Sequence, residues 1–79
     1  MSKPPLDWKD PKPGIGHLKK EAETKTVRYA IYDIGSGAFN AVAEVKAAQG
    51  GTTNSLVTER VRSLPEAQTA CQEHWDKQP

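Results

Sequence analysis

The chain has 79 residues, which suits one small domain, and a domain of this size buries only about 60 to 65% of its unfolded surface. Its formal net charge of +1 argues against a protein that coats nucleic acid by neutralising many phosphates. No segment approaches the roughly 20 apolar residues that span a bilayer, and the start of the chain lacks the apolar run of a signal peptide, so a cytoplasmic location is expected.

Residues 1–25 are predicted to form an irregular N-terminal arm. They hold most of the prolines and lysines and few β-branched residues, which is typical of a segment without regular structure. Leu6 and Trp8 are the apolar side chains expected to fasten this arm to the core. The run at 17–23 is rich in lysine, glutamate and alanine, which favours a short helix of one or two turns.

Two strands joined by a tight turn follow the arm. In residues 27–32, valine, tyrosine and isoleucine alternate with arginine, alanine and tyrosine, and residues 39–46 alternate in the same way. Between them, residues 35–37 read Gly-Ser-Gly, which supplies the positive φ angles of a close reversal. This pattern predicts a β-hairpin with one apolar face.

A third strand is predicted after the hairpin. Residues 49–54 are polar and rich in glycine and threonine, which indicates a longer turn. Residues 56–62 then form an extended segment rich in β-branched side chains. Val57 and Val61 are expected to point into the core.

The clearest local signal is the start of a helix. Ser63 and Glu66 have the spacing of a capping box, with a proline between them where its missing N–H is harmless. The helix is predicted from Leu64 to about Asp76. Its apolar residues recur at three- and four-residue steps and include Cys71, so this stripe is expected to lie against the sheet.

These elements predict an α+β domain over residues 26–79, with the irregular arm at 1–25. The sheet is expected to have three antiparallel strands, and one C-terminal helix is expected to pack on one of its faces, in the order β-β-β-α. Most of the strongly apolar side chains are needed to build this small core.

The sequence offers little for catalysis or for binding a metal. Its acids are scattered, and no pair has the spacing of a general acid and base. One cysteine excludes an internal disulfide, and one cysteine with two histidines, His17 and His74, argues against a zinc site. Cys71 is expected to be buried and unreactive, and we predict a non-catalytic protein with no cofactor and no small-molecule substrate.

The sheet face away from the helix is the candidate partner-binding surface. The residues predicted to bind a partner there are Arg28, Tyr32, Lys46, Arg60 and Arg62. Such a mixture of basic and aromatic side chains can dock on protein or nucleic acid, but it also occurs on ordinary solvated sheets. The acidic side of the helix, around Glu66 and Glu73, is an alternative surface for a basic partner.

Four short motifs resemble those of small proteins of unknown function encoded by phages and prophages. They are Leu6-x-Trp8, Tyr29-x-Ile31, Phe39-x-Ala41, and Leu64-Pro65-Glu66-Ala67 leading to His74. That group includes anti-CRISPR proteins, and the resemblance implies an inhibitor that occupies a functional surface of a nucleoprotein complex in the host cytoplasm.

The predicted strand and helix order also looks like two kinds of nucleic-acid-binding domain. One is the three-stranded DNA-binding domain of some integrases and plant transcription factors, and the other is the later part of a double-stranded RNA-binding domain. The start of the helix lacks the lysine cluster of the RNA-binding family, and the sheet lacks the dense arginine pattern of the plant factors.

Three functions are therefore expected as alternatives. The first is inhibition of a host nucleoprotein defence complex, such as a CRISPR surveillance complex, by blocking its access to DNA. The second is direct nucleic-acid binding by a regulator or a recombination accessory protein. The third is a phage structural protein or a homo-oligomeric adaptor that associates through a strand edge. None of the three involves a membrane.

Overall fold

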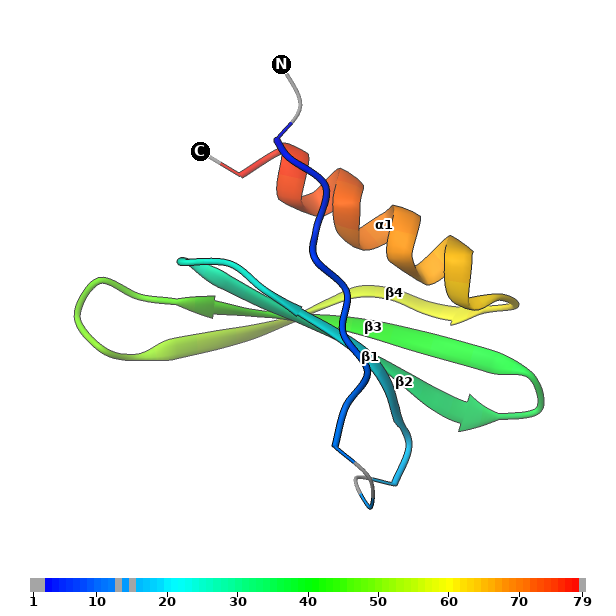
Figure 1. Ribbon diagram of the computed structural model, residues 1–79. Coiled ribbons are helices and arrows are strands. Elements are labelled where there is room, and N and C mark those ends of the chain that lie inside the picture. Colours follow the sequence, from blue (N-terminus) through cyan, green and yellow to red (C-terminus); the bar gives the residue numbers. More distant parts are fainter. Residues whose placement is uncertain (1–2, 13, 15, 79) are drawn as a thin grey trace.

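The computed structural model describes residues 3–12, 14 and 16–78. Along the chain the elements are β1 (Leu18–Glu23), β2 (Val27–Gly35), β3 (Ala38–Lys46), β4 (Thr52–Val61) and α1 (Leu64–Asp76). The strands form one antiparallel sheet in the order β1-β2-β3-β4, and α1 lies across one face of it (Figure 1). The predicted α+β class and the C-terminal helix are confirmed, but the sheet has four strands instead of three.

The additional strand is β1, which replaces the short helix predicted near residues 17–23. Its lysines, glutamates and alanine favour a helix locally, but backbone pairing with β2 stabilises the segment more than a short isolated helix would. Ala22 pairs with Tyr29 and is only 2% exposed, so β1 extends the buried face of the sheet. Tertiary pairing therefore outweighs the local helix propensity of this segment.

The hairpin between β2 and β3 agrees with the predicted alternation. Gly35, Ser36 and Gly37 all have positive φ angles, of 89°, 57° and 73°, so the two glycines occupy positions where other residues would be strained. Tyr29 pairs with Ala43 and Ile31 with Ala41, and all four side chains face α1 with no exposed surface.

The last strand, β4, begins earlier than predicted. Thr52, Thr53 and Asn54, assigned to a turn from their polarity, pair with β3 instead, and the turn is closed by the Ala47 N–H, which donates to the Gly51 carbonyl at 2.7 Å. Threonine is a good strand former, so these residues extend the hairpin. Two bulges then offset β4 against β3, and Arg60 has a φ of 56°.

The helix has the predicted bounds, Leu64 to Asp76. Ser63 caps it, because its side-chain oxygen accepts a hydrogen bond from the Glu66 N–H at 3.3 Å. The described residues contain no membrane-spanning helix, since α1 has only 13 residues.

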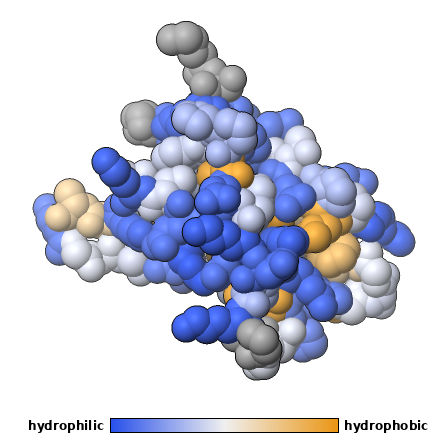
Figure 2. Space-filling model, viewed as in Figure 1, coloured by the Kyte–Doolittle hydropathy of each residue, from blue (hydrophilic) through white to orange (hydrophobic). Residues whose placement is uncertain are grey.

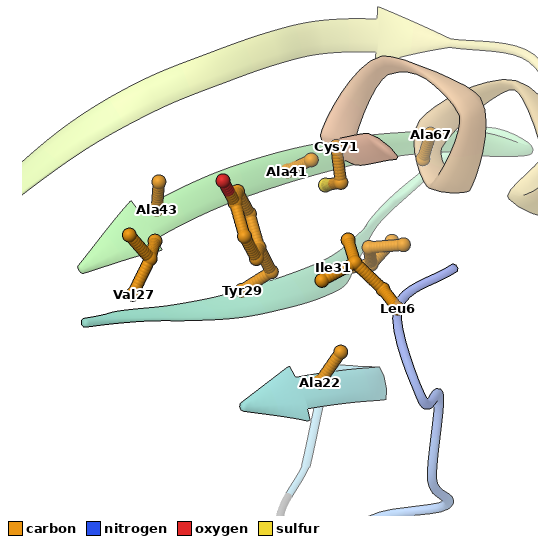
Figure 3. Packing of buried hydrophobic residues seen from close by; sticks show 9 residues of the cluster. All are labelled: Leu6, Ala22, Val27, Tyr29, Ile31, Ala41, Ala43, Ala67 and Cys71. Atoms are coloured by element: carbon orange, nitrogen blue, oxygen red, sulfur yellow. The ribbon is translucent and has the colours of Figure 1, made fainter. Parts of the chain in front are cut away.

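The core lies between α1 and the sheet (Figure 3). The three largest fully buried side chains come from β2, namely Val27, Tyr29 and Ile31. Alanines of β1, β3 and α1 surround them, together with Cys71 and the arm residue Leu6. The alanines leave room for the three large side chains of β2, and larger, partly buried side chains such as Trp8, Phe39 and Trp75 pack around this cluster.

The arm runs from the C-terminal end of α1 down to β1 (Figure 1). Leu6 is 8% exposed and Trp8 packs against the core, so both predicted anchors are confirmed. Lys9 pairs with Glu21 of β1 through two backbone hydrogen bonds of 2.8 and 3.1 Å. Figure 2 shows this side of the molecule as mainly hydrophilic, with hydrophobic side chains at the surface where α1 faces the sheet.

Candidate partner-binding surface

The sheet face away from α1, here called the outer face, is defined by cross-strand pairs between β2 and β3. Arg28 is opposite Glu44, and Tyr32 is opposite Asn40. Directly opposed residues share a face, and the intervening residues of β2 are buried under α1. Among the described residues no helix lies over the outer face, which is the face predicted to bind a partner.

Two of the predicted binding residues form ion pairs on this face with glutamates of β1. The Arg28 guanidinium lies 2.5 Å from a carboxylate oxygen of Glu21, and the Lys46 ammonium lies 2.6 Å from one of Glu23. The hydrogen bond and positive charge of Lys46 lower the pKa of Glu23. Both cations are thus compensated locally, which reduces what they offer to an anionic ligand.

Three shallow hollows follow one another along the outer face. The first lies over β2 and β3 and includes Arg28 and Tyr32. The second extends from Tyr32 to Ile34, and the third from Ile34 to Arg60 and Arg62. Because neighbouring hollows share Tyr32 or Ile34, these five residues mark one continuous surface, here called the outer-face track.

The large exposed apolar side chains gather at this surface. Tyr32 is 36% exposed and Ile34 46%, and both line the track. Leu56 is 54% exposed and lies opposite Val42, whose side chain lines the first hollow. These three are the large hydrophobic residues that stand exposed within the described part of the chain. Exposed apolar groups that gather on one face are typical of an interaction site.

The far end of the track is basic. Arg60 and Arg62 are exposed, and neither makes an ion pair with another residue that the structure describes. The Arg60 N–H donates to the Asn40 side chain at 2.9 Å, which ties the bulged end of β4 to β3. This end therefore presents two uncompensated guanidinium groups next to an apolar patch.

The structure brings four of the five predicted residues together. Arg28, Tyr32, Arg60 and Arg62 line the track, whereas Lys46 lies outside its hollows and pairs with Glu23. Sequence reasoning missed Ile34 and Leu56. Ile34 lies two residues beyond Tyr32 on β2, where the register with β3 shifts between Asp33 and Gly35, so strand alternation alone would not have placed it on this surface.

Cys71 and His74 lie on α1, on the other side of the sheet, and their contacts fit a role in the core rather than in catalysis. Burial raises the pKa of the Cys71 thiol to about 12, which is the opposite of nucleophile activation. Tyr29 and His74 are 2.7 Å apart between the hydroxyl and Nδ1, with their rings edge to face. Burial raises the pKa of Tyr29 to about 12, so we assign its hydroxyl as the donor to neutral His74.

The pairing of His74 predicts how stability depends on pH. Burial, with a further contribution from the positive charge of Lys77, lowers the pKa of His74 in the folded protein. The unfolded state therefore takes up the proton first, and His74 should make folding less stable as the pH falls below about 6.5. Urea unfolding at several pH values should show a weaker decline for His74→Gln than for the wild type. The matched control, Thr69→Gln at an exposed non-ionisable position of the same helix, should decline like the wild type, and an unchanged decline for His74→Gln would contradict this assignment.

The described residues offer no evident metal site: no three His, Cys, Asp or Glu side chains among them come together in an arrangement that could hold an ion. A small hollow where the arm meets β1 is lined by charged side chains, including Asp7, Lys9 and Glu23. It also contains the Arg28 and Glu21 ion pair, so part of its charge is already satisfied internally.

Comparison with protein-family models, with curated proteins and with solved structures finds no significant match for this chain. Function is therefore inferred from the chemistry of its surfaces.

Proposed function

We propose that this protein is a non-catalytic binding protein that docks on a partner protein through the outer-face track. The observation that carries this proposal is the gathering of Tyr32, Ile34 and Leu56 at one uncovered face of the sheet. An aromatic residue at the centre of an apolar patch is the kind of anchor that dominates binding energy at protein interfaces. Arg60 and Arg62 at one end of the patch favour a partner that has carboxylates beside its own apolar surface.

The charges favour a protein over a nucleic acid as the ligand. Among the predicted binding residues, Arg28 and Lys46 are compensated by Glu21 and Glu23, whereas Arg60 and Arg62 make no ion pair with any residue that the structure describes. Proteins that bind duplexes tightly usually neutralise many phosphates, commonly about six to ten. Two guanidinium groups would supply only a small part of the electrostatic binding energy that such proteins gain from phosphate contacts.

The resemblance to short phage proteins makes a host nucleoprotein defence complex the partner to test first. A CRISPR surveillance complex has protein surfaces that must stay open for DNA to enter. A small rigid domain seated on such a surface would block entry without any chemistry. In this proposal the apolar part of the track supplies the affinity, and the two arginines orient the domain.

The test measures binding to a purified CRISPR surveillance complex, together with DNA cleavage or DNA binding by that complex. Wild-type protein is expected to bind and to reduce DNA access. Tyr32→Asp and Ile34→Asp should each weaken binding by roughly 2 kcal/mol or more, which is about 30-fold in Kd. Thr69→Asp, which places the same charge on the exposed side of α1, is the control and should bind normally.

Two results would contradict parts of this proposal. Normal binding by the Tyr32→Asp and Ile34→Asp variants would exclude the outer-face track as the contact. Binding to free duplex DNA that falls steeply with added salt would identify direct nucleic-acid recognition instead. If the wild type bound none of the complexes tested, that partner class would be wrong.

A further inference from the structure

The two edges of the sheet differ in how much they are covered. At one edge, β1 is engaged by the arm through the two backbone hydrogen bonds between Lys9 and Glu21. At the other edge, β4 pairs with β3 alone, and within the described residues no segment pairs with its free side. An open edge presents N–H and C=O groups that another strand can bind.

The first half of β4 lacks the usual protection of an edge. From Thr52 to Leu56 every residue is exposed, and the segment contains no charged residue and no proline. Its pairing with β3 is regular over this stretch, and the first bulge comes after Leu56. Natural proteins usually protect such an edge with lysine, proline or a bulge, so this unprotected stretch of five residues is open to pairing with another strand.

We propose that this stretch pairs with the same stretch of a second copy, in an antiparallel register centred on Asn54. Thr52 of each copy would then lie opposite Leu56 of the other, and no two like charges would face each other. The symmetric pair would partly cover Leu56, which is 54% exposed in the single chain. Because the arm engages the other edge, the assembly closes as a two-fold dimer and does not extend into a fibre.

A second copy fits this edge better than a strand of unrelated sequence. The segment is neutral, so it carries no charge pattern that would select an oppositely charged strand. A two-fold axis normal to the sheet would continue it from one copy into the other and keep both outer faces on the same side. The dimer would leave Tyr32 and Ile34 of both copies uncovered on one side, although Leu56, which also belongs to the proposed partner surface, would lie partly in the seam.

The test compares two double variants that differ in the sign of one charge. Thr52→Lys with Leu56→Lys places lysine opposite lysine across the proposed seam, twice by symmetry. Thr52→Glu with Leu56→Lys places opposite charges there, while within one chain the two positions lie about 13 Å apart along the strand. Sedimentation over a range of protein concentrations measures the mass, starting from 8.6 kDa for one chain.

We expect the wild type to reach twice the mass of one chain, the Lys/Lys variant to remain a single chain, and the Glu/Lys variant to associate at least as well as the wild type. Ile34→Lys, an exposed position on a central strand, should leave the dimer intact. A monomeric wild type at all concentrations would overturn the proposal, as would dimers that persist in the Lys/Lys variant. If both double variants were monomeric and folded by circular dichroism, the register centred on Asn54 would be wrong.

Discussion

Replacing Tyr29 with alanine is expected to lower the free energy of unfolding by about 3 to 5 kcal/mol. Tyr29 has no exposed surface and is the largest fully buried side chain of the core. Several of its neighbours in the core cluster are alanines, including Ala22, Ala41 and Ala43, which cannot move to fill the space it would leave. A small domain has only about 5 to 15 kcal/mol in total, so this one change threatens folding at physiological temperature.

Equilibrium unfolding in urea measures this loss of stability, and two further tyrosine variants provide values for comparison. Tyr29→Phe keeps the ring and removes only the hydrogen bond to His74, so it should cost about 1 kcal/mol. Tyr32→Ala removes an exposed tyrosine from the same strand and should change stability much less. Equal losses for Tyr29→Ala and Tyr32→Ala would mean that the core is not centred on Tyr29.

The parts of the fold that the sequence predicted are those set by local patterns. Ser63 and the following proline define the start of α1 through backbone chemistry confined to one turn. The hairpin follows from strict alternation and from glycines at positions that need positive φ. In both cases the residues that decide the structure are close neighbours in the chain.

The parts that the sequence did not predict depend on distant partners. The residues of β1 favour a helix when taken alone. They form a strand because they pair with the edge of β2, where Ala22 lies opposite Tyr29. The same limit applied to the candidate surface. Alternation placed Arg28 on the outer face, but its ion pair with Glu21 could be foreseen only by recognising β1 as a strand.

The arm of residues 3–12 is expected to stabilise the domain because it connects α1 to β1. The Leu6 N–H donates to the Gln72 side chain at 2.8 Å, and the Gln72 amide donates to the Pro4 carbonyl at 3.3 Å. Further along, Lys9 pairs with β1. Leu6 itself is buried with the core cluster, so its side chain closes the end of the space between α1 and the sheet (Figure 3).

Leu6→Ala is therefore expected to lower the free energy of unfolding by about 2 to 3 kcal/mol, near the lower end for a buried leucine because the arm can partly relax into the gap. Leu56→Ala is the matched control, since Leu56 is 54% exposed, and it should change stability by about 0.5 kcal/mol or less. Urea unfolding at low protein concentration gives both values without a contribution from self-association. Limited proteolysis should also cut the arm faster in Leu6→Ala than in the wild type, because detachment exposes its backbone. Equal stability of the two leucine variants, with no change in cleavage of the arm, would show that α1 and the sheet hold together without it.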